Sequence, residues 1–167
     1  MEAGSSTNFK IRKMKYIEYT QKDVIELYRL YNKLYFNGQL RMPRITFTPG
    51  GIGRGGLYSC RLSKKLRKPS QERIWLNSEI YFTEKTMREL LVHEMLHQYL
   101  RMVGRADPIV HGWNYTIEAW KLKWKYGVDV HAHWHYNLHW KCDREFPDTI
   151  LGAVAKKIYM FLYLTIL

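Results

Sequence analysis

Two histidines and a glutamate lie close together near the middle of the chain, in the order His93, Glu94 and His97. Residues four apart lie one above the other on a single helix face, so a helix here would direct both imidazoles at one point. Two imidazole nitrogens placed in this way can bind zinc, at roughly 2.0–2.1 Å each. Glu94 lies beside the first ligand, where it would act as general base on a zinc-activated water rather than bind the metal.

The residues around this motif predict a buried helix. No proline or glycine interrupts residues 87–103, and Gly104 suits the position just after a helix end. At the other end, Thr86 and Glu89 have the spacing of a capping box. Apolar residues occur on nearly every side, which is typical of a helix enclosed by protein. Because unpaired buried polar groups are costly, a metal ion that satisfies the polar residues of this helix is the favoured interpretation.

A catalytic zinc site has three protein ligands and leaves one position for water. The candidates for the third ligand are Asp107, His111, Glu118 and the histidines after residue 130. His111 follows His97 across a glycine and a proline-containing loop, which is enough chain to return to the metal. Glu118 lies two turns further along the same predicted helix, roughly 10 Å from His111 at a rise of 1.5 Å per residue. His111 and Glu118 therefore cannot bind the same zinc ion together, and spacing alone does not decide which of them is the third ligand.

Two further helices are predicted. The first begins at Thr20, which has a capping pattern, and ends at Asn37. The second begins near His111 and ends at Tyr126, where a glycine follows. One stripe of this second helix is apolar and is expected to be core: Trp113, Ile117, Trp120 and Trp124.

Strands are predicted at residues 45–48, 57–62 and 73–77. The glycine-rich segment 49–56 lacks the lysine and hydroxyl residue of a phosphate-binding loop, so we interpret it as a hairpin connection between the first two strands. Four histidines follow the last helix at His131, His133, His135 and His139. They could bind a second metal, although an exposed polar strand face is the favoured interpretation.

The composition is that of a globular protein with an excess of positive charge. The chain has 167 residues, 46% of them hydrophobic, and 27 lysines and arginines against 15 acidic residues give a formal net charge of +12. Such an excess favours polyanionic partners, usually nucleic acid. The candidate phosphate contacts lie in one loop and on the second predicted helix: Lys64, Lys65, Arg67, Lys68, Lys121 and Lys125. We expect weak binding of DNA without sequence preference, especially of single strands.

Three regions are expected along the chain. Residues 1–14 read as a disordered basic leader, residues 15–149 as one domain, and residues 150–167 as an apolar C-terminal segment of unknown role. The terminal apolar run is too short for a transmembrane span, and we expect it to pack on the domain. Cys60 and Cys142 are far apart in sequence and form no C-x-x-C pair, and nothing indicates a disulfide framework, which favours a reducing, intracellular compartment, cytoplasmic in a bacterium or nuclear in a eukaryote. We also expect a monomer.

These motifs together resemble the SprT-like (Spartan-type) family of zinc metalloproteases. The family's pattern is H-E-x-x-H, a loop, then H-G-x-x-aromatic, which corresponds here to His93 through His97 and His111 through Tyr115. The resemblance implies one catalytic Zn²⁺ with His111 as the third ligand and Glu94 as the base. It also implies proteolysis of DNA-bound or DNA-crosslinked proteins.

The resemblance extends over residues 20–142. Residues 30–40 are similar to the family's first helix and its Y-F-N-x-x-L ending, and residues 74–77 to the strand before the metal helix. The segment from His139 to Cys142 resembles the start of the family's C-terminal zinc ribbon. No cysteine follows Cys142 in the sequence, so we expect an incomplete ribbon and DNA contacts on basic segments instead.

The prediction is an α+β, zincin-like single domain, in which a small, mainly antiparallel sheet packs on the helices that carry H-E-x-x-H. Its expected function is that of a zinc-dependent endopeptidase acting on DNA-associated proteins, with the substrate peptide added along a sheet edge. Tyr115 and the tyrosines of residues 126–136 are candidates to stabilise the oxyanion. Two alternatives are a non-enzymatic nucleic-acid-binding module with structural zinc and a zinc hydrolase of non-peptide amides.

Overall fold

The computed structural model describes residues 15–50, 54–63 and 69–130, and the backbone of residues 139–140. In chain order the elements are α1 (Gln21–Phe36), β1 (Arg44–Thr48), β2 (Gly56–Leu62), β3 (Pro69–Asn77), β4 (Ile80–Tyr81), α2 (Glu84–Met102), α3 (Trp113–Tyr126) and β5 (His139–Trp140). The fold is α+β, with these three helices and a small mixed sheet. The predicted leader, the Lys64–Lys68 loop, most of the histidine-rich segment and the C-terminal segment lie outside the described residues.

The main sheet has the strand order β1-β3-β2, with β1 parallel and β2 antiparallel to β3. The expected hairpin between β1 and β2 is therefore wrong, and the sheet is mixed rather than mainly antiparallel. Parallel neighbours need a long crossover, and residues 49–68 provide one that includes β2 itself. β3 is the central strand, and its inward residues Ile74 and Leu76 are fully buried. A second, small antiparallel sheet pairs β4 with β5.

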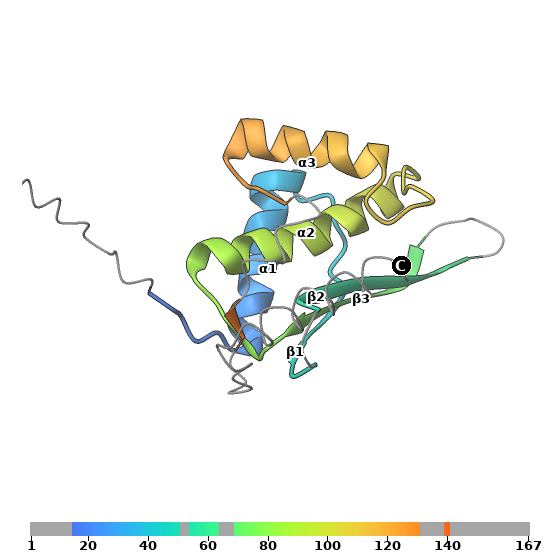
Figure 1. The fold of residues 1–167 in the computed structure, drawn as a ribbon. Helices are drawn as coiled ribbons and strands as arrows, with labels where there is room; N and C mark the ends of the chain where they lie inside the picture. The colour runs from blue at the N-terminus through green and yellow to red at the C-terminus, as the bar shows by residue number, and fades with distance from the viewer. Residues whose placement is uncertain (1–14, 51–53, 64–68, 131–138, 141–167) are drawn as a thin grey trace, which may run out of the picture.

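α2 is the central element of the fold. It contacts α1, α3, β2 and β3, so that it lies between the sheet on one side and α3 on the other (Figure 1). The prediction of a buried helix is confirmed, because its apolar residues face inward on nearly every side. The fully buried ones include Met87, Leu90, Leu91, Val92 and Met95.

The ends of α2 are fixed by local hydrogen bonds. The capping box consists of Thr83 and Thr86 rather than Thr86 and Glu89, so the helix begins three residues earlier than the predicted cap implied. At the other end Gly104 has φ of 72°, as predicted for a residue just after a helix. The N–H of Arg105 then reaches back to the carbonyl of Leu100 at 2.8 Å, which closes the helix end.

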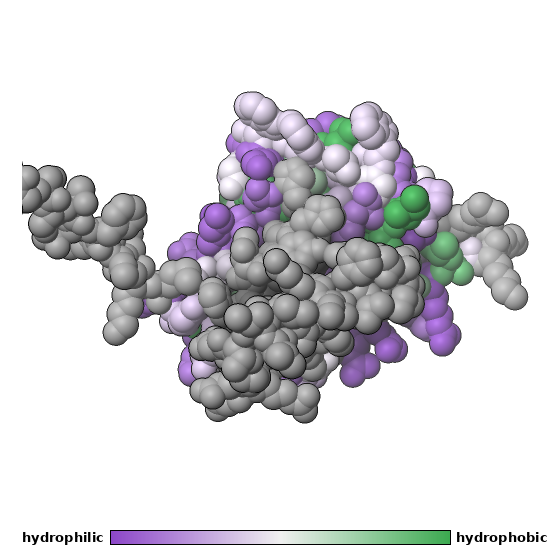
Figure 2. All heavy atoms as spheres, viewed as in Figure 1, coloured by the Kyte–Doolittle hydropathy of each residue, from purple (hydrophilic) through white to green (hydrophobic). Residues whose placement is uncertain are grey.

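The aromatic stripe of α3 faces outward, contrary to the prediction that it forms core. Trp113 and Trp124 have 75% and 79% of their surface exposed, and Trp120 has 51%. The buried face of the helix is formed by Tyr115, Ala119 and Leu122 instead. Both faces carry apolar residues at helical spacing, so periodicity does not distinguish them; the small Ala119 lies on the buried face, where helices approach closely. In Figure 2 the upper edge of the molecule, over α3, shows pale side chains of intermediate hydropathy among hydrophilic ones.

Within the part of the chain that the structure describes, no helix combines the length and the apolar composition needed to cross a membrane.

Candidate metal centre

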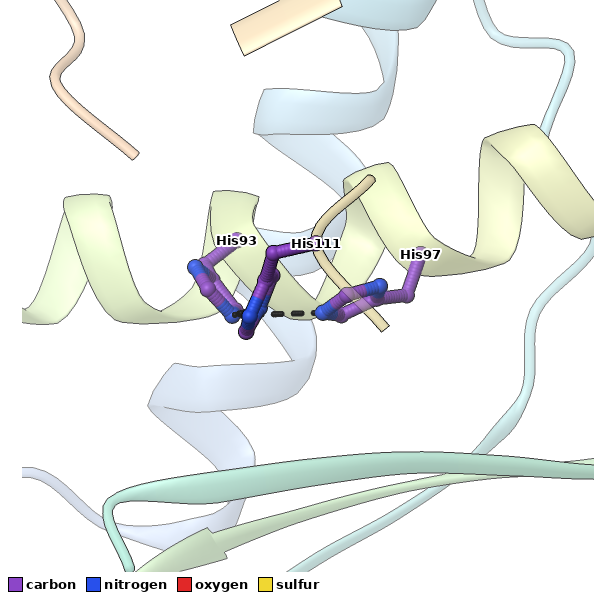
Figure 3. A group of neighbouring side chains, drawn as sticks. All are labelled: His93, His97 and His111. Carbon is purple, nitrogen blue, oxygen red and sulfur yellow. Dashed lines mark hydrogen bonds between the residues drawn. The ribbon is translucent and has the colours of Figure 1, made fainter. Parts of the chain in front are cut away.

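Three imidazole rings converge beside α2 (Figure 3). His93 and His97 come from α2, one turn apart, and His111 comes from the turn before α3. The Nε2 atom of His93 lies 3.2 Å from that of His97 and 3.1 Å from that of His111. The ligand atoms of all three residues lie within 4.8 Å of one another, so this group could hold a metal ion.

The spacing of the nitrogens fits a tetrahedral metal. Two nitrogens that each lie about 2.05 Å from a tetrahedral zinc are about 3.3 Å apart, close to the separations seen here. His93 is buried, whereas His97 and His111 are partly exposed, so one side of the group is open. Three imidazoles with an open side are the donor set of a catalytic rather than a structural zinc site.

Asp107 positions the turn that carries His111. Its carboxylate accepts the backbone N–H of Asn114 at 3.1 Å and that of Tyr115 at 2.9 Å, which satisfies the first turn of α3. The helix cap residue, Gly112, has no side chain to do this. A Cβ at Gly112 would lie 2.6 Å from the Asp107 Cβ, so glycine is what lets the carboxylate approach. Asp107, weighed above as a ligand, therefore caps α3 instead.

The ring of Tyr115 packs against His97 and His111, with ring centres 4.7 Å apart in each case, and its hydroxyl reaches the Nδ1 side of His93. Its Oη is 2.7 Å from His93 Nδ1 and donates to the carbonyl of Val130, also at 2.7 Å. Burial, together with the Glu94 charge, raises the pKa of Tyr115 well above its ordinary value, so the hydroxyl is protonated. Because Tyr115 is only 1% exposed and its hydroxyl is already hydrogen-bonded, it does not suit the oxyanion role considered for it.

Glu94 is a residue of α2, and its side chain lies against β2, an edge strand of the main sheet. Only 3% of its surface is exposed. A Cβ at Gly56 would come within 2.7 Å of Glu94 Oε1, so the glycine in β2 makes room for the carboxyl group. Burial raises the pKa of Glu94 to about 8, although a hydrogen bond from the Tyr58 backbone N–H and the charge of Arg54 lower it. A nearby cation would favour the ionised form of this carboxyl.

Glu118 is held away from the three histidines by other partners. Its Oε1 accepts from Arg105 at 3.0 Å and from Lys121 at 2.8 Å. It is not a member of the group that could hold a metal. The geometry thus brings His111, and not Glu118, to the two histidines of α2.

The SprT-like family model matches residues 24–132, more than half of the chain. This chain belongs to the SprT-like family. No curated protein matches the sequence. The matched region contains most of α1, the main sheet, α2 and α3, and thus every residue of the metal centre described above.

Of the basic residues predicted to contact DNA, the structure of this SprT-like chain describes two. Lys121 and Lys125 are exposed on α3, and each directly follows an exposed tryptophan, Trp120 or Trp124. Lys121 forms an ion pair with Glu118, and Lys125 lies 5.0 Å from the ring centre of Tyr126. The remaining candidates lie in the undescribed loop, and the later histidines have no described side chains.

Sequence reasoning missed two groups that shape the site, and both are backbone atoms. The Tyr58 N–H bonds Glu94, and the Val130 carbonyl bonds Tyr115. Neither leaves a signal in residue type, because every residue except proline carries both groups. The glycine at position 56 was a signal that could have been used, since an isolated glycine in a strand often marks a close approach.

Proposed function

We propose that this SprT-like chain is a zinc-dependent endopeptidase with a zincin-like domain. His93, His97 and His111 are the proposed zinc ligands, and Glu94 is the proposed general base. The observation that carries the proposal is the convergence of three imidazole nitrogens into a group that is partly exposed. Two of these imidazoles belong to α2, the helix that also holds the buried Glu94. Family membership supports the same function.

A zinc ion held by His93, His97 and His111 would supply Lewis acidity toward the scissile carbonyl and would lower the pKa of water toward 7. Glu94 takes a proton from the attacking water on its carboxylate and passes that proton to the leaving amine. The Tyr58 N–H orients the carboxylate by hydrogen bonding. β2 is an edge strand beside Glu94, so a substrate peptide could pair with it and lie across the site.

The geometry favours this proposal over the two alternatives. A structural zinc is held by four protein ligands, whereas the group in the described residues supplies three. A hydrolase of small amides has no need of a sheet edge, whereas β2 offers main-chain partners to an extended peptide.

We further propose that the substrates are proteins associated with or crosslinked to DNA. The net charge of +12 supports phosphate contacts. The outward face of α3 adds exposed indole rings, Trp113 and Trp124, and Lys121 and Lys125 are exposed on the same helix. Aromatic rings among lysines suit single strands, whose bases can stack on them.

Zinc analysis of two single variants tests the ligand assignment. We expect one tightly bound zinc per wild-type chain, loss of that zinc in His111→Ala, and full retention in Glu118→Ala. Glu118→Ala is a suitable control because the ion-pair partners of Glu118 are Arg105 and Lys121, and Glu118 is not a member of the histidine group. Full zinc in the His111 variant with loss in the Glu118 variant would overturn the assignment.

A further inference from the structure

We propose that the hydroxyl of Tyr115 is a positioning group that holds His93 in the tautomer whose Nε2 lone pair faces His97 and His111. The inference rests on the proposed metal site and adds to it a residue that does not itself bind the metal. A histidine can bind a metal through Nε2 only when that nitrogen carries no proton.

Three polar atoms meet behind the His93 ring. Tyr115 Oη lies 2.7 Å from His93 Nδ1 and 2.7 Å from the Val130 carbonyl oxygen, and His93 Nδ1 lies 3.2 Å from that same oxygen. Two protons are available for hydrogen bonds among these three atoms, one from the tyrosine hydroxyl and one from a nitrogen of the His93 ring. The Val130 oxygen has no proton to give and can only accept.

One assignment of the protons leaves every atom satisfied. The Tyr115 hydroxyl donates to Val130, and His93 Nδ1–H donates to the lone pair of Tyr115 Oη. If the ring proton were on Nε2 instead, Nδ1 and the Val130 oxygen would face each other as two acceptors 3.2 Å apart and compete for a single hydroxyl proton. These contacts therefore select the Nδ1–H tautomer and direct the Nε2 lone pair of His93 toward His97 and His111.

Burial makes this selection strong. His93 and Tyr115 have 2% and 1% of their surfaces exposed, so bulk water does not reach the three polar atoms to replace a lost partner. Outer hydrogen bonds of this kind orient a ligand ring, and their removal typically costs 10–100-fold in metal affinity. Tyr115 lies in the first turn of α3, four residues after His111, so one helix start both supplies a ligand and orients another.

The experiment compares two tyrosine-to-phenylalanine variants of the full chain. Tyr115→Phe removes the hydroxyl behind His93. Tyr28→Phe is the matched control, because Tyr28 is also fully buried and its hydroxyl lies 2.9 Å from the Arg41 carbonyl and 2.7 Å from Gln98 Oε1. Zinc affinity is measured by competition with a chromophoric chelator at pH 8, and folding is checked by thermal melting of the zinc-free proteins.

We expect zinc binding about 10–100-fold weaker in Tyr115→Phe and within about 3-fold of wild type in Tyr28→Phe. Equal zinc affinity in wild type and Tyr115→Phe would overturn the inference while leaving the metal site intact. A wild-type chain that binds no zinc would instead overturn the proposed function.

A second measurement does not depend on the folding of any variant. Nitrogen-15 NMR of the zinc-free wild-type chain at pH 8 reports which ring nitrogen of His93 carries the proton. We expect the proton on Nδ1. A wild-type His93 protonated on Nε2 would overturn the inference.

Discussion

At the residue scale, the site depends on how a few polar groups are paired inside an apolar helix. Glu94 is almost fully buried, yet it has a hydrogen-bond donor in the Tyr58 N–H and space left by Gly56. Burial raises its pKa to about 8, although the Tyr58 N–H and the charge of Arg54 lower it. A divalent ion held by the three histidines would stabilise the carboxylate, so metal binding would itself prepare the base for its role.

The histidines show the same coupling between ligand and support. His93 is oriented by Tyr115 and Val130, while His111 depends on the Asp107 cap that begins its helix. The direct metal contacts could therefore be proposed from residue types and spacing, whereas their supports could not. A cap from Asp107 or a carbonyl from Val130 requires the path of the chain, which short-range patterns do not contain.

At the scale of elements, the cap of α3 links stability to metal binding. Asp107→Ala should lower the free energy of unfolding by about 1 kcal/mol, as is typical of a lost N-cap. It should also weaken zinc binding, because His111 lies in the turn that the cap holds. Thr20→Ala, which removes the cap of α1 far from the histidines, should cost similar stability and leave zinc affinity unchanged. Thermal melting and chelator competition measure the two effects, and equal zinc affinity in both variants would contradict this account.

The same cap gives the stability a defined pH dependence. Burial raises the pKa of Asp107, but hydrogen bonds from Tyr115 and Asn114 outweigh this effect and leave the pKa below its ordinary value. A carboxyl group whose pKa is lowered by folding stabilises the protein above its unfolded pKa, and this contribution is lost as pH falls through its folded pKa. The difference in melting temperature between wild type and Asp107→Ala should therefore be full at pH 7 and shrink below about pH 4. A difference that grows on acidification would contradict the assignment.

The elements themselves could be predicted where a local signal exists. The caps at Thr20 and Gly104 and the helix ends at Asn37 and Tyr126 are confirmed, because each depends on residues within one turn. The sheet order was wrong because pairing is decided over distance: β1 chooses β3 rather than the next strand in sequence. The Thr83 cap was missed because a second threonine, Thr86, gave an equally good local pattern.

The inverted face of α3 has a different cause. Tryptophan is expected inside on hydrophobicity alone, yet Trp113 and Trp124 are the most exposed aromatic residues of that helix. The choice of face follows from the contact with α2, where Ala119 and Tyr115 fit and where Tyr115 reaches His93. Function at the metal centre and the exposure of the indoles are thus two consequences of one helix orientation.

At the scale of the whole molecule, the charge of +12 predicts weak DNA binding that falls steeply with salt. Trp124→Ala should weaken binding to single strands by about 1–3 kcal/mol for each base that stacks, without changing the salt dependence. Lys125→Ala should reduce the slope of log K against log salt by about 0.7 if it contacts one phosphate of a single strand. Titration of labelled single- and double-stranded oligonucleotides at several salt concentrations separates the two effects. Absence of binding at low salt, or strong binding that ignores salt, would contradict the electrostatic account.

The measurement that tests the central proposal most directly is the zinc content and proteolytic rate of Glu94→Gln, determined on the same preparation. Glutamine is close in size to glutamate and keeps an oxygen that can accept from the Tyr58 N–H, so the fold and the three histidines should be undisturbed. We expect one zinc per chain, as in the wild type, and proteolysis of an unfolded protein substrate reduced by about 10²–10⁴-fold. Proteolysis within a few-fold of the wild-type rate, with zinc still bound, would show that Glu94 is not the base and would contradict the mechanism.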